Sequence, residues 1–342
     1  MPRATGFRTL LVQACVLLLR GRDAFHPFSK RNNIAIAYSS QVPAFHKFFL
    51  TKPLADAFRK NVSGSKDGLP DWAREIANGN DAGLFKADGA VWKVHGNLGT
   101  LVGGVRALLL QAAHPAPLSG VAQHSRYESD PMGRLAGTTR WLTITTFGST
   151  QTIEHEAKRV NAMHSKVSGD YTDKSGKHLN YRAQDSRFLL WVHCAFTDSF
   201  IKSHLALGYP LPEGADEYIR DWAKSAIPLG LTDAPKSLAE LEATLNDFRK
   251  SDLARSDKTL EVVGFILKPP FGKSGLLFYR IIANAAIATL DQNELEILGL
   301  KAKSKIWLKI ARGALNVFSA FLGPESPSQN LARQRILRIS PN

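Results

Sequence analysis

Cysteine is nearly absent from this 342-residue chain. The only two cysteines, Cys15 and Cys194, lie in apolar stretches that are predicted to be helical. A structural disulfide is therefore not expected, and a reducing, cytoplasmic compartment is the default expectation. Cysteine and histidine do not occur at the spacing of a zinc site. The composition, 44% hydrophobic and 22% charged, excludes wholesale disorder, a collagen-like repeat and a disulfide scaffold.

Long apolar runs are also missing. The longest, Leu10 to Leu19, is ten residues long and lies between Arg8 and Arg20. A membrane-spanning helix needs about 18 apolar residues, so this segment is too short to cross a bilayer. It is not followed by the small-residue cleavage site of a signal peptide, and we interpret it as an amphipathic or core helix.

Several motifs of common enzyme classes are lacking. The chain has no phosphate-binding GxxxxGK[ST] loop, no dinucleotide fingerprint, no GxSxG and no HExxH. Gly96, Gly99, Gly103 and Gly104 fit no phosphate motif, and we interpret them as positions of close helix packing. Strand signals are scarce, and the segment from Leu142 to Phe147 is ambiguous between strand and helix.

Acidic residues are scarce at both ends of the chain. The net charge is +14; residues 1–60 contribute +8 and residues 301–342 contribute +7, so the middle of the chain is nearly neutral. A nucleic-acid-binding protein would carry a basic stripe on its folded body together with a recognisable module, which this sequence lacks. Peripheral contact with an anionic membrane and simple solvation of the ends both remain open.

What the sequence does contain is a series of apolar or amphipathic helical segments. They are predicted at Val105 to Ala113, Pro131 to Gly148, Thr152 to Val167, Phe188 to Leu207, Glu213 to Ala226, Ser237 to Phe248, Leu276 to Leu290 and Ile306 to Leu322. The prediction is an all-α fold, a single-domain bundle of about ten helices. A basic N-terminal segment (1–60) precedes the helical domain (61–322, with its core motifs at about 90–300), and a C-terminal tail (323–342) follows it.

Local signals set the expected helix ends. Asp71 is predicted to cap a short helix, and Thr152 to cap a helix that Gly169 ends. The polar segment from Asp170 to Lys177 is predicted to be a loop.

Histidine and arginine are concentrated within 80 residues of these apolar helices: His114, His124, Arg126, Arg134, Arg140, Arg159, His164 and His193. Taken singly, each histidine could be a satisfied core residue or a helix cap, and Arg126 or Arg140 could pair with a nearby carboxylate such as Glu156. Taken together, they form a pattern that is typical of metal and haem sites in helical bundles, where side chains from facing helices project into the core. Haem needs an imidazole, an apolar pocket and basic groups, whereas the carboxylate pairs of a di-iron site are missing.

Three separated segments resemble one known family: VRALLLQAAHPAPLSGVAQHSRYESDPMGRLAGTTRWLTITTFGS, then RVNAMHSKVSG, then YRAQDSRFLLWVHCAFTDSF. A later segment, LKPPFGKSGLLFYRIIANAAIATL, continued by ELEILGLK, also fits. The family joins MpaB-type oxygenases to the rubber oxygenase called latex clearing protein, and the likeness covers about residues 90–320. The resemblance implies an all-helical fold with a globin-like core, a b-type haem, and cleavage of carbon–carbon double bonds with dioxygen.

The resemblance also implies residue roles. It makes His164 the proximal haem ligand, and Arg134 and Thr138 the distal catalytic pair, one helical turn apart. Gly137 stands where the rubber oxygenase has a lysine that can approach the iron. That departure leaves the sixth iron position to water, oxygen or another side chain, and it puts polyisoprene as the substrate in doubt.

Other residues of the matching motifs have less definite roles. Arg126 and Arg140 are candidates for contact with the haem propionates. His193 could be a second haem ligand or a proton carrier. His114 and His124 belong to matching motifs without an assigned role.

The functional expectation is therefore a haem b-dependent oxygenase that uses dioxygen on an apolar, isoprenoid-like or lipid-like small molecule or polymer. The alternative is a haem-binding sensor or carrier without turnover. A third interpretation is a membrane-peripheral structural protein that has lost its cofactor.

Overall fold

The computed structural model describes residues 69–124, 131–269, 273–323 and 325–340 of the chain. The basic N-terminal segment 1–60 lies outside the described residues. In chain order the elements are α3 (Asp71–Arg74), η1 (Glu75–Ala77), α4 (Ala90–His95), α5 (Thr100–Gln111), α6 (Pro115–His124), α7 (Pro131–Phe147), α8 (Thr150–His164), β1 (Ser168–Thr172), β2 (His178–Arg182), α9 (Ser186–Ala206), α10 (Gly214–Ala223), η2 (Lys224–Leu229), α11 (Leu238–Ser251), α12 (Asp257–Leu267), α13 (Lys273–Ile287), α14 (Gln292–Leu298), α15 (Ile306–Leu322) and α16 (Pro327–Ile339).

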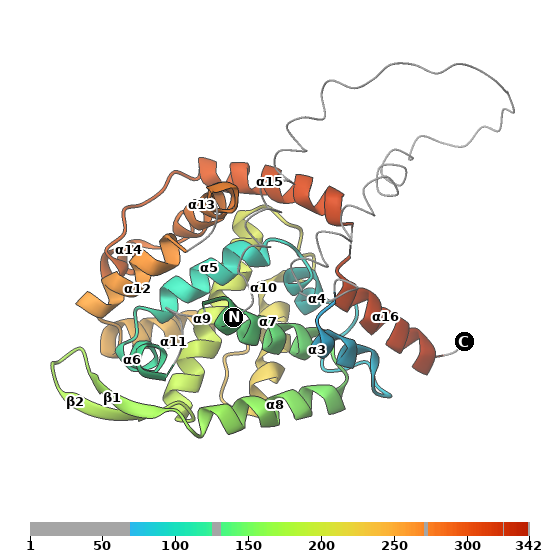
Figure 1. Cartoon of the computed structure of the whole chain (residues 1–342), viewed down its shortest axis with the longest axis horizontal. Coiled ribbons are helices and arrows are strands. Elements are labelled where there is room, and N and C mark those ends of the chain that lie inside the picture. The colour runs from blue at the N-terminus through green and yellow to red at the C-terminus, as the bar shows by residue number, and fades with distance from the viewer. Residues whose placement is uncertain (1–68, 125–130, 270–272, 324, 341–342) are drawn as a thin grey trace, which may run out of the picture.

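The fold is all-α, as predicted, with one small two-stranded sheet among the described residues. Helices α5 and α9 pack against each other most extensively and form the centre of the core (Figure 1). Helix α13 covers α5, and α15 in turn packs on α13. The globin-like core that the resemblance implies stays a prediction.

The contact between α5 and α9 depends on a glycine. A Cβ atom at Gly103 would lie 2.7 Å from Cδ1 of Phe200 and 3.1 Å from its Cα. A side chain at this position would push the two backbones apart, which confirms the close-packing interpretation for Gly103. A Cβ atom at Gly104 would meet no atom within 4 Å, so the interpretation does not extend to that residue.

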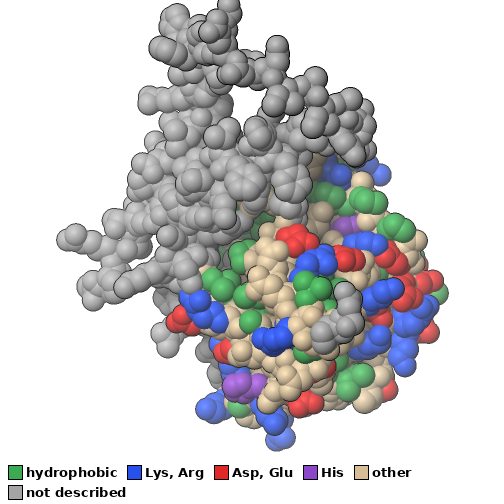
Figure 2. Space-filling view, turned by 90° about the vertical axis from the view of Figure 1, so that its right-hand side faces the viewer, with side chains coloured by type: hydrophobic (Ala, Val, Ile, Leu, Met, Phe, Trp, Pro, Cys, Tyr) green, Lys and Arg blue, Asp and Glu red, His purple; other side chains and the backbone are tan. Residues whose placement is uncertain are grey.

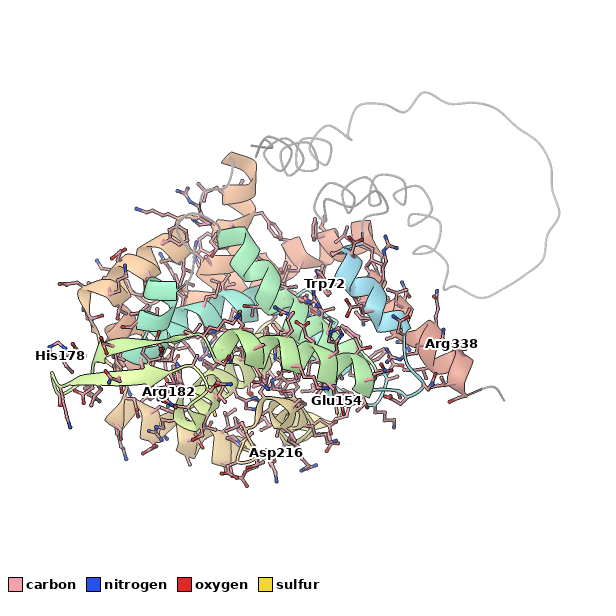
Figure 3. The ribbon with its side chains drawn as sticks, turned by 60° about the horizontal axis from the view of Figure 1, so that its bottom comes forward. Trp72, Glu154, His178, Arg182, Asp216 and Arg338 are labelled. Atoms are coloured by element: carbon pink, nitrogen blue, oxygen red, sulfur yellow. The ribbon has the colours of Figure 1, made fainter. Side chains whose placement is uncertain are left out.

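The predicted loop after α8 is instead a hairpin. Strands β1 and β2 pair antiparallel, with Ser168 opposite Arg182. Asp173 closes the turn because its carboxylate accepts hydrogen bonds from the backbone N–H groups of Ser175 and Lys177, at 2.8 and 2.9 Å. The hairpin projects from the helical body, with His178 at its far end (Figure 3).

The C-terminal residues, predicted to be a tail, contain helix α16. Ser326 caps it in a capping box with Gln329, and Pro327 occupies the first turn. The helix packs against η1, α3 and α7. The tail prediction failed because the basic composition of this segment hid a buried face that includes Ala332 and Arg335.

Helix ends were predicted less well than helix positions. Pro70, not Asp71, is the N-cap of α3, and Ser149, not Thr152, caps α8. Helix α8 ends at His164, well before Gly169. The ambiguous segment from Leu142 to Phe147 is the end of helix α7. Helices α12 and α14, each started by a capping box, were not predicted.

Candidate functional site

Helices α7 and α8 carry most of the predicted site residues. They are joined by Gly148 and Ser149, and the Ser149 hydroxyl accepts a hydrogen bond from the backbone N–H of Thr152 at 3.3 Å. The two helices also contact each other directly. At 1.5 Å per residue, Arg134 and His164 each lie about 20 Å along their helices from the connection.

His164 lies on the inward face of α8. Ile153, Ala157 and Val160 occupy the same face, three or four residues apart, and all three are buried. The imidazole is half-buried, and its Nδ1 atom has no hydrogen-bond partner within the part of the chain that the structure describes. Burial lowers the pKa of His164, so its ring is neutral at pH 7. Met163, the preceding residue, is 49% exposed.

The base of the hairpin brings the end of α8 beside the start of α9. The backbone N–H of Ala183 donates to the carbonyl oxygen of Val167 at 2.9 Å. The Gln184 amide donates to the carbonyl oxygen of Asn161 at 3.4 Å. The two hydrogen bonds thus hold the segment that leads into α9 against the end of α8.

His193 lies two turns into α9. Leu189, Leu190 and Phe196, on the same side of the helix, are apolar yet only half-buried. The Nε2 atom of His193 is buried without a hydrogen-bond partner among the described residues. Burial lowers the pKa of His193 to about 4, so this imidazole is neutral as well. The consecutive helices α8 and α9 thus each carry a neutral imidazole with a ring nitrogen that has no hydrogen-bond partner among the described residues.

The predicted distal residues lie on α7. Thr138 is half-buried, and so is Gly137, where an added Cβ would meet no heavy atom within 4 Å. The described residues thus leave space beside α7 at the position where the resemblance places a lysine. Arg134 lies within the helix, but its side chain is outside the described part, as is that of His124. Arg126 also lies outside the described residues.

Arg140 belongs to an ion-pair cluster around a buried carboxylate. Its Nε donates to Oε2 of Glu156 at 2.8 Å, and the guanidinium of Arg159 reaches Oε1 of the same carboxylate at 2.5 Å. Glu75 lies 3.8 Å from the Nη2 atom of Arg140. The ion-pair interpretation of Arg140 is confirmed for Glu156. Contact with a haem propionate stays a prediction.

His114 lies between α5 and α6, inside an aromatic cage. Its Nδ1 atom accepts a hydrogen bond from the backbone N–H of Ala116 at 3.3 Å, so it caps the helix that follows it. Rings of Phe188, Trp191 and Phe248 surround it, with centroids 5.5 to 6.1 Å away. Burial lowers the pKa of His114 to about 4. The expected cap was a bond to a carbonyl at the end of the preceding helix; the bond that forms instead caps the start of α6.

A buried ionic network at the centre of the bundle was not predicted. The guanidinium of Arg106 lies 2.6 Å from Asp198 and 3.1 Å from Glu294, and all three side chains are buried. The network ties α5, α9 and α14 together. The signal was present in the sequence, because Arg106 and Asp198 each interrupt an apolar helix, and charges inside a core must be paired.

A second unpredicted polar pair is His95 and Tyr218. Nε2 of His95 lies 3.0 Å from the Tyr218 hydroxyl, and the imidazole packs against Trp222 with centroids 4.3 Å apart. Burial lowers the pKa of His95 to about 3, which keeps the ring neutral.

Within the described residues, no group of three or more histidine, cysteine, aspartate or glutamate side chains could hold a metal ion. A haem iron, in contrast, needs only one or two protein ligands. The described helices also include none long and apolar enough to cross a membrane.

The sequence model of one protein family matches residues 92–321, about two thirds of the chain. That family is described as ER-bound oxygenase mpaB/B'/Rubber oxygenase, catalytic domain. The matched span runs from α4 to α15 and includes every predicted site residue. No curated protein and no solved structure matches the chain.

Proposed function

Because the chain belongs to the family of MpaB-type and rubber oxygenase catalytic domains, an oxygenase family, we propose that it is a haem b-dependent oxygenase. We propose that it acts on an apolar, isoprenoid-like or lipid-like substrate by oxidative cleavage of a carbon–carbon double bond. The observation that carries the proposal is the neutral imidazole of His164, half-buried on the inward face of α8 with its Nδ1 unsatisfied.

The residues present fit a haem. His164 would hold the iron, because a neutral imidazole on an otherwise apolar face is the ligand that haem iron accepts. Haem b, when bound, supplies the activation of dioxygen whose two oxygen atoms end in the two carbonyl groups of the cleaved product. Arg126 and Arg140 would contact the propionates; Arg140 would do so with the guanidinium nitrogens that Glu156 leaves free.

The remaining roles belong to α7 and α9. Arg134 would stabilise the negative charge that develops on dioxygen during the reaction. Its guanidinium would be a fixed hydrogen-bond donor in a site that holds little water. Thr138, one turn along α7, would donate a hydrogen bond on the same side. The half-buried apolar row of α9, Leu189, Leu190 and Phe196, would exclude water and receive the apolar substrate.

Haem content and an optical spectrum test this proposal. After expression with added haem, the purified protein should show a Soret band, and His164→Ala should lose most of the haem. His193→Ala, measured beside it, should retain the haem. A wild-type protein without a Soret band would contradict the proposal. Loss of haem in His193→Ala but not in His164→Ala would show that the proximal ligand is His193 on α9.

A second candidate function is a haem-binding sensor or carrier without turnover. The Nε2 of His193, which has no hydrogen-bond partner among the described residues, favours it, because His164 and His193 would then both be available to hold the iron. Six-coordinate, low-spin haem that binds no oxygen would support the sensor. Five-coordinate haem, with cleavage of an apolar olefin, would support the oxygenase.

A further inference from the structure

The basic residues of the C-terminal region fall into two groups. Arg312 lies over the ring of Tyr209 at 3.6 Å, and its guanidinium donates to the carbonyl oxygen of Leu207 at 3.1 Å. The three arginines of α16 bind carboxylates or backbone carbonyls. The second group consists of four exposed lysines that have no ion pair with an acidic side chain among the described residues. They are Lys301, Lys303, Lys305 and Lys309.

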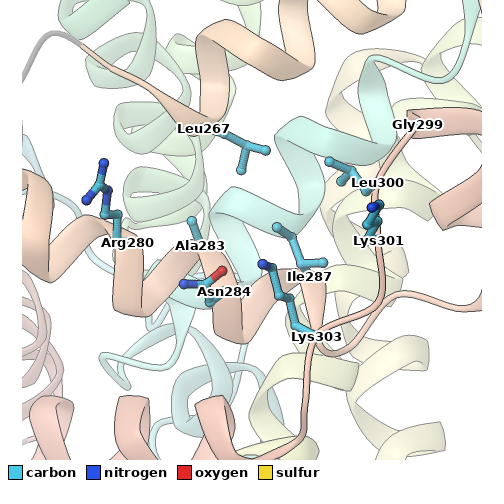
Figure 4. Close-up of a pocket in the computed structure, with 9 residues that line it drawn as sticks. All are labelled: Leu267, Arg280, Ala283, Asn284, Ile287, Gly299, Leu300, Lys301 and Lys303. Carbon is cyan, nitrogen blue, oxygen red and sulfur yellow. The ribbon is translucent and has the colours of Figure 1, made fainter.

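Two of these lysines border a pocket. The pocket has a volume of about 330 Å³ and lies between α12, the C-terminal half of α13 and the segment 299–303 (Figure 4). Arg280, Lys301 and Lys303 line it together with the Asn284 amide, and the rest of its lining is mostly apolar. Arg280 is exposed and also lacks an ion pair within the described residues. Within the described residues, the pocket therefore presents three cations without an ion pair, and no carboxylate lines it.

An exposed apolar surface adjoins the pocket. Ile306, Ile310 and Val317 lie on the outward face of α15, four and seven residues apart, and are 42 to 53% exposed. Leu277, which is 64% exposed, lies one turn before Arg280 on α13. The two helices are joined by Phe278 and Phe318, whose ring centroids are 5.6 Å apart. We call the four lysines, Arg280 and these four apolar side chains the α13–α15 face.

Its charge distinguishes this face from other parts of the surface. The sequence has no acidic residue between positions 297 and 324. On the side of the molecule shown in Figure 2, in contrast, basic and acidic side chains of the described residues alternate. Large exposed aliphatic side chains next to unpaired lysines are typical of proteins that lie on an anionic bilayer.

We propose that the α13–α15 face docks on a bilayer that contains anionic phospholipid, with a headgroup phosphate in the pocket. The aliphatic side chains of α15 would enter the boundary between headgroups and acyl chains, and the lysines would stay at headgroup level. Binding requires neither haem nor substrate. It can therefore be tested separately from the oxygenase function.

Co-sedimentation of the full-length protein with vesicles tests this proposal. Vesicles of phosphatidylcholine with 30% phosphatidylserine should bind the protein at low salt, and binding should weaken as salt rises. Lys301→Gln/Lys303→Gln should lower the partition coefficient about 25-fold, since one lysine near an anionic surface contributes about fivefold. Ile310→Ser/Val317→Ser should lower it in the same assay.

A matched control separates this face from general charge attraction. Lys158→Gln/Lys250→Gln removes the same charge from exposed lysines elsewhere, and α8, with Lys158, lies across the molecule from α15 (Figure 1). The control should change binding less than twofold. An equal loss in the control, or no binding to anionic vesicles at low salt, would overturn the proposal.

A photo-crosslinker at Ile310 identifies the occupant of the face. In the presence of anionic vesicles, crosslinks to lipid are expected. Crosslinks to a second copy of the chain, or to residues 1–68 of the same chain, would instead assign the face to a protein contact and overturn the proposal.

Discussion

At the residue scale, five of the described histidines share a physical state. His95, His114, His164, His193 and His204 all have a pKa below the ordinary value of 6.5, and burial is the largest cause in each case. A buried imidazole is held neutral because its charged form loses hydration. A neutral imidazole can bind a haem iron, as proposed for His164, and it can accept a backbone hydrogen bond, as His114 does.

The neutral state of His114 makes the stability of the protein depend on pH. The folded pKa of His114 is about 4, below the unfolded value, so the unfolded chain binds a proton that the folded chain does not. Stability is therefore complete above pH 6.5 and falls as the pH drops toward 4. Between pH 7 and pH 5 His114 should account for a loss of about 2 kcal/mol in the free energy of unfolding.

Urea denaturation of the wild type and of His114→Asn at both pH values measures this loss. The variant should be less stable at pH 7 but should lose less stability between the two values. The same pH dependence in both proteins would show that His114 is already charged in the folded state.

A second residue-scale prediction concerns the distal side of α7. Arg134→Ala should keep haem but lose oxygenase activity by a factor on the order of 10²–10³, because a fixed charge stabiliser is removed. Thr138→Ala should cost about tenfold or less, since one neutral hydrogen bond contributes roughly 0.5–1.5 kcal/mol. Turnover at equal haem content measures both. Arg220→Ala, on the exposed surface of α10, is the control and should retain full activity.

At the element scale, the close approach of α5 and α9 places the core. Gly103 allows this approach, and the Arg106–Asp198 ion pair lies between the same two helices. Because α9 is fixed against α5, the position of His193 follows from packing that lies away from the site.

Two neighbouring glycines test this role of helix packing. Gly103→Ala should destabilise the protein by about 1–3 kcal/mol, because the new Cβ would meet the backbone of α9. Gly104→Ala, where a Cβ has space, should be neutral or stabilise by up to about 1 kcal/mol through helix propensity. Thermal unfolding of both variants measures the difference. Equal effects of the two substitutions would contradict the close-packing role of Gly103.

At the scale of the whole molecule, α16 connects the end of the chain to its first described elements. The buried guanidinium of Arg335 donates to the carbonyl oxygens of Ile76, Asp81 and Ala82. Arg333 pairs with Asp88 and Glu325. The helix thus fixes the segment from η1 toward α4, which has little regular structure of its own.

Arg335→Gln should therefore destabilise the folded protein by about 3 kcal/mol, because buried carbonyl groups lose a charged donor. Leu337→Gln, at a position of the same helix that is 72% exposed, should change stability by less than about 0.5 kcal/mol. Chemical denaturation measures both. A small effect of Arg335→Gln would show that α16 adds little to the stability of the body.

The sequence by itself determined the all-α class, the positions of most helices, the family and the helices that carry the candidate site. Apolar periodicity and motif spacing are local properties, and burial in a helix bundle preserves them. It also determined that His164 and Thr138 lie on helix faces. The hairpin and α16 were missed because a strand of five residues and a mostly polar helix give weak periodic signals.

Only the tertiary structure decided which charges meet. The partners of Arg106 and Arg335 come from elements far apart in the sequence, and no local pattern encodes such distances. The same packing leaves Lys301 and Lys303 without an ion pair among the described residues, while the arginines of α16 bind carboxylates or backbone carbonyls. A net charge is fixed by composition, but whether a charge is bound internally or presented outward is decided by which helices pack together.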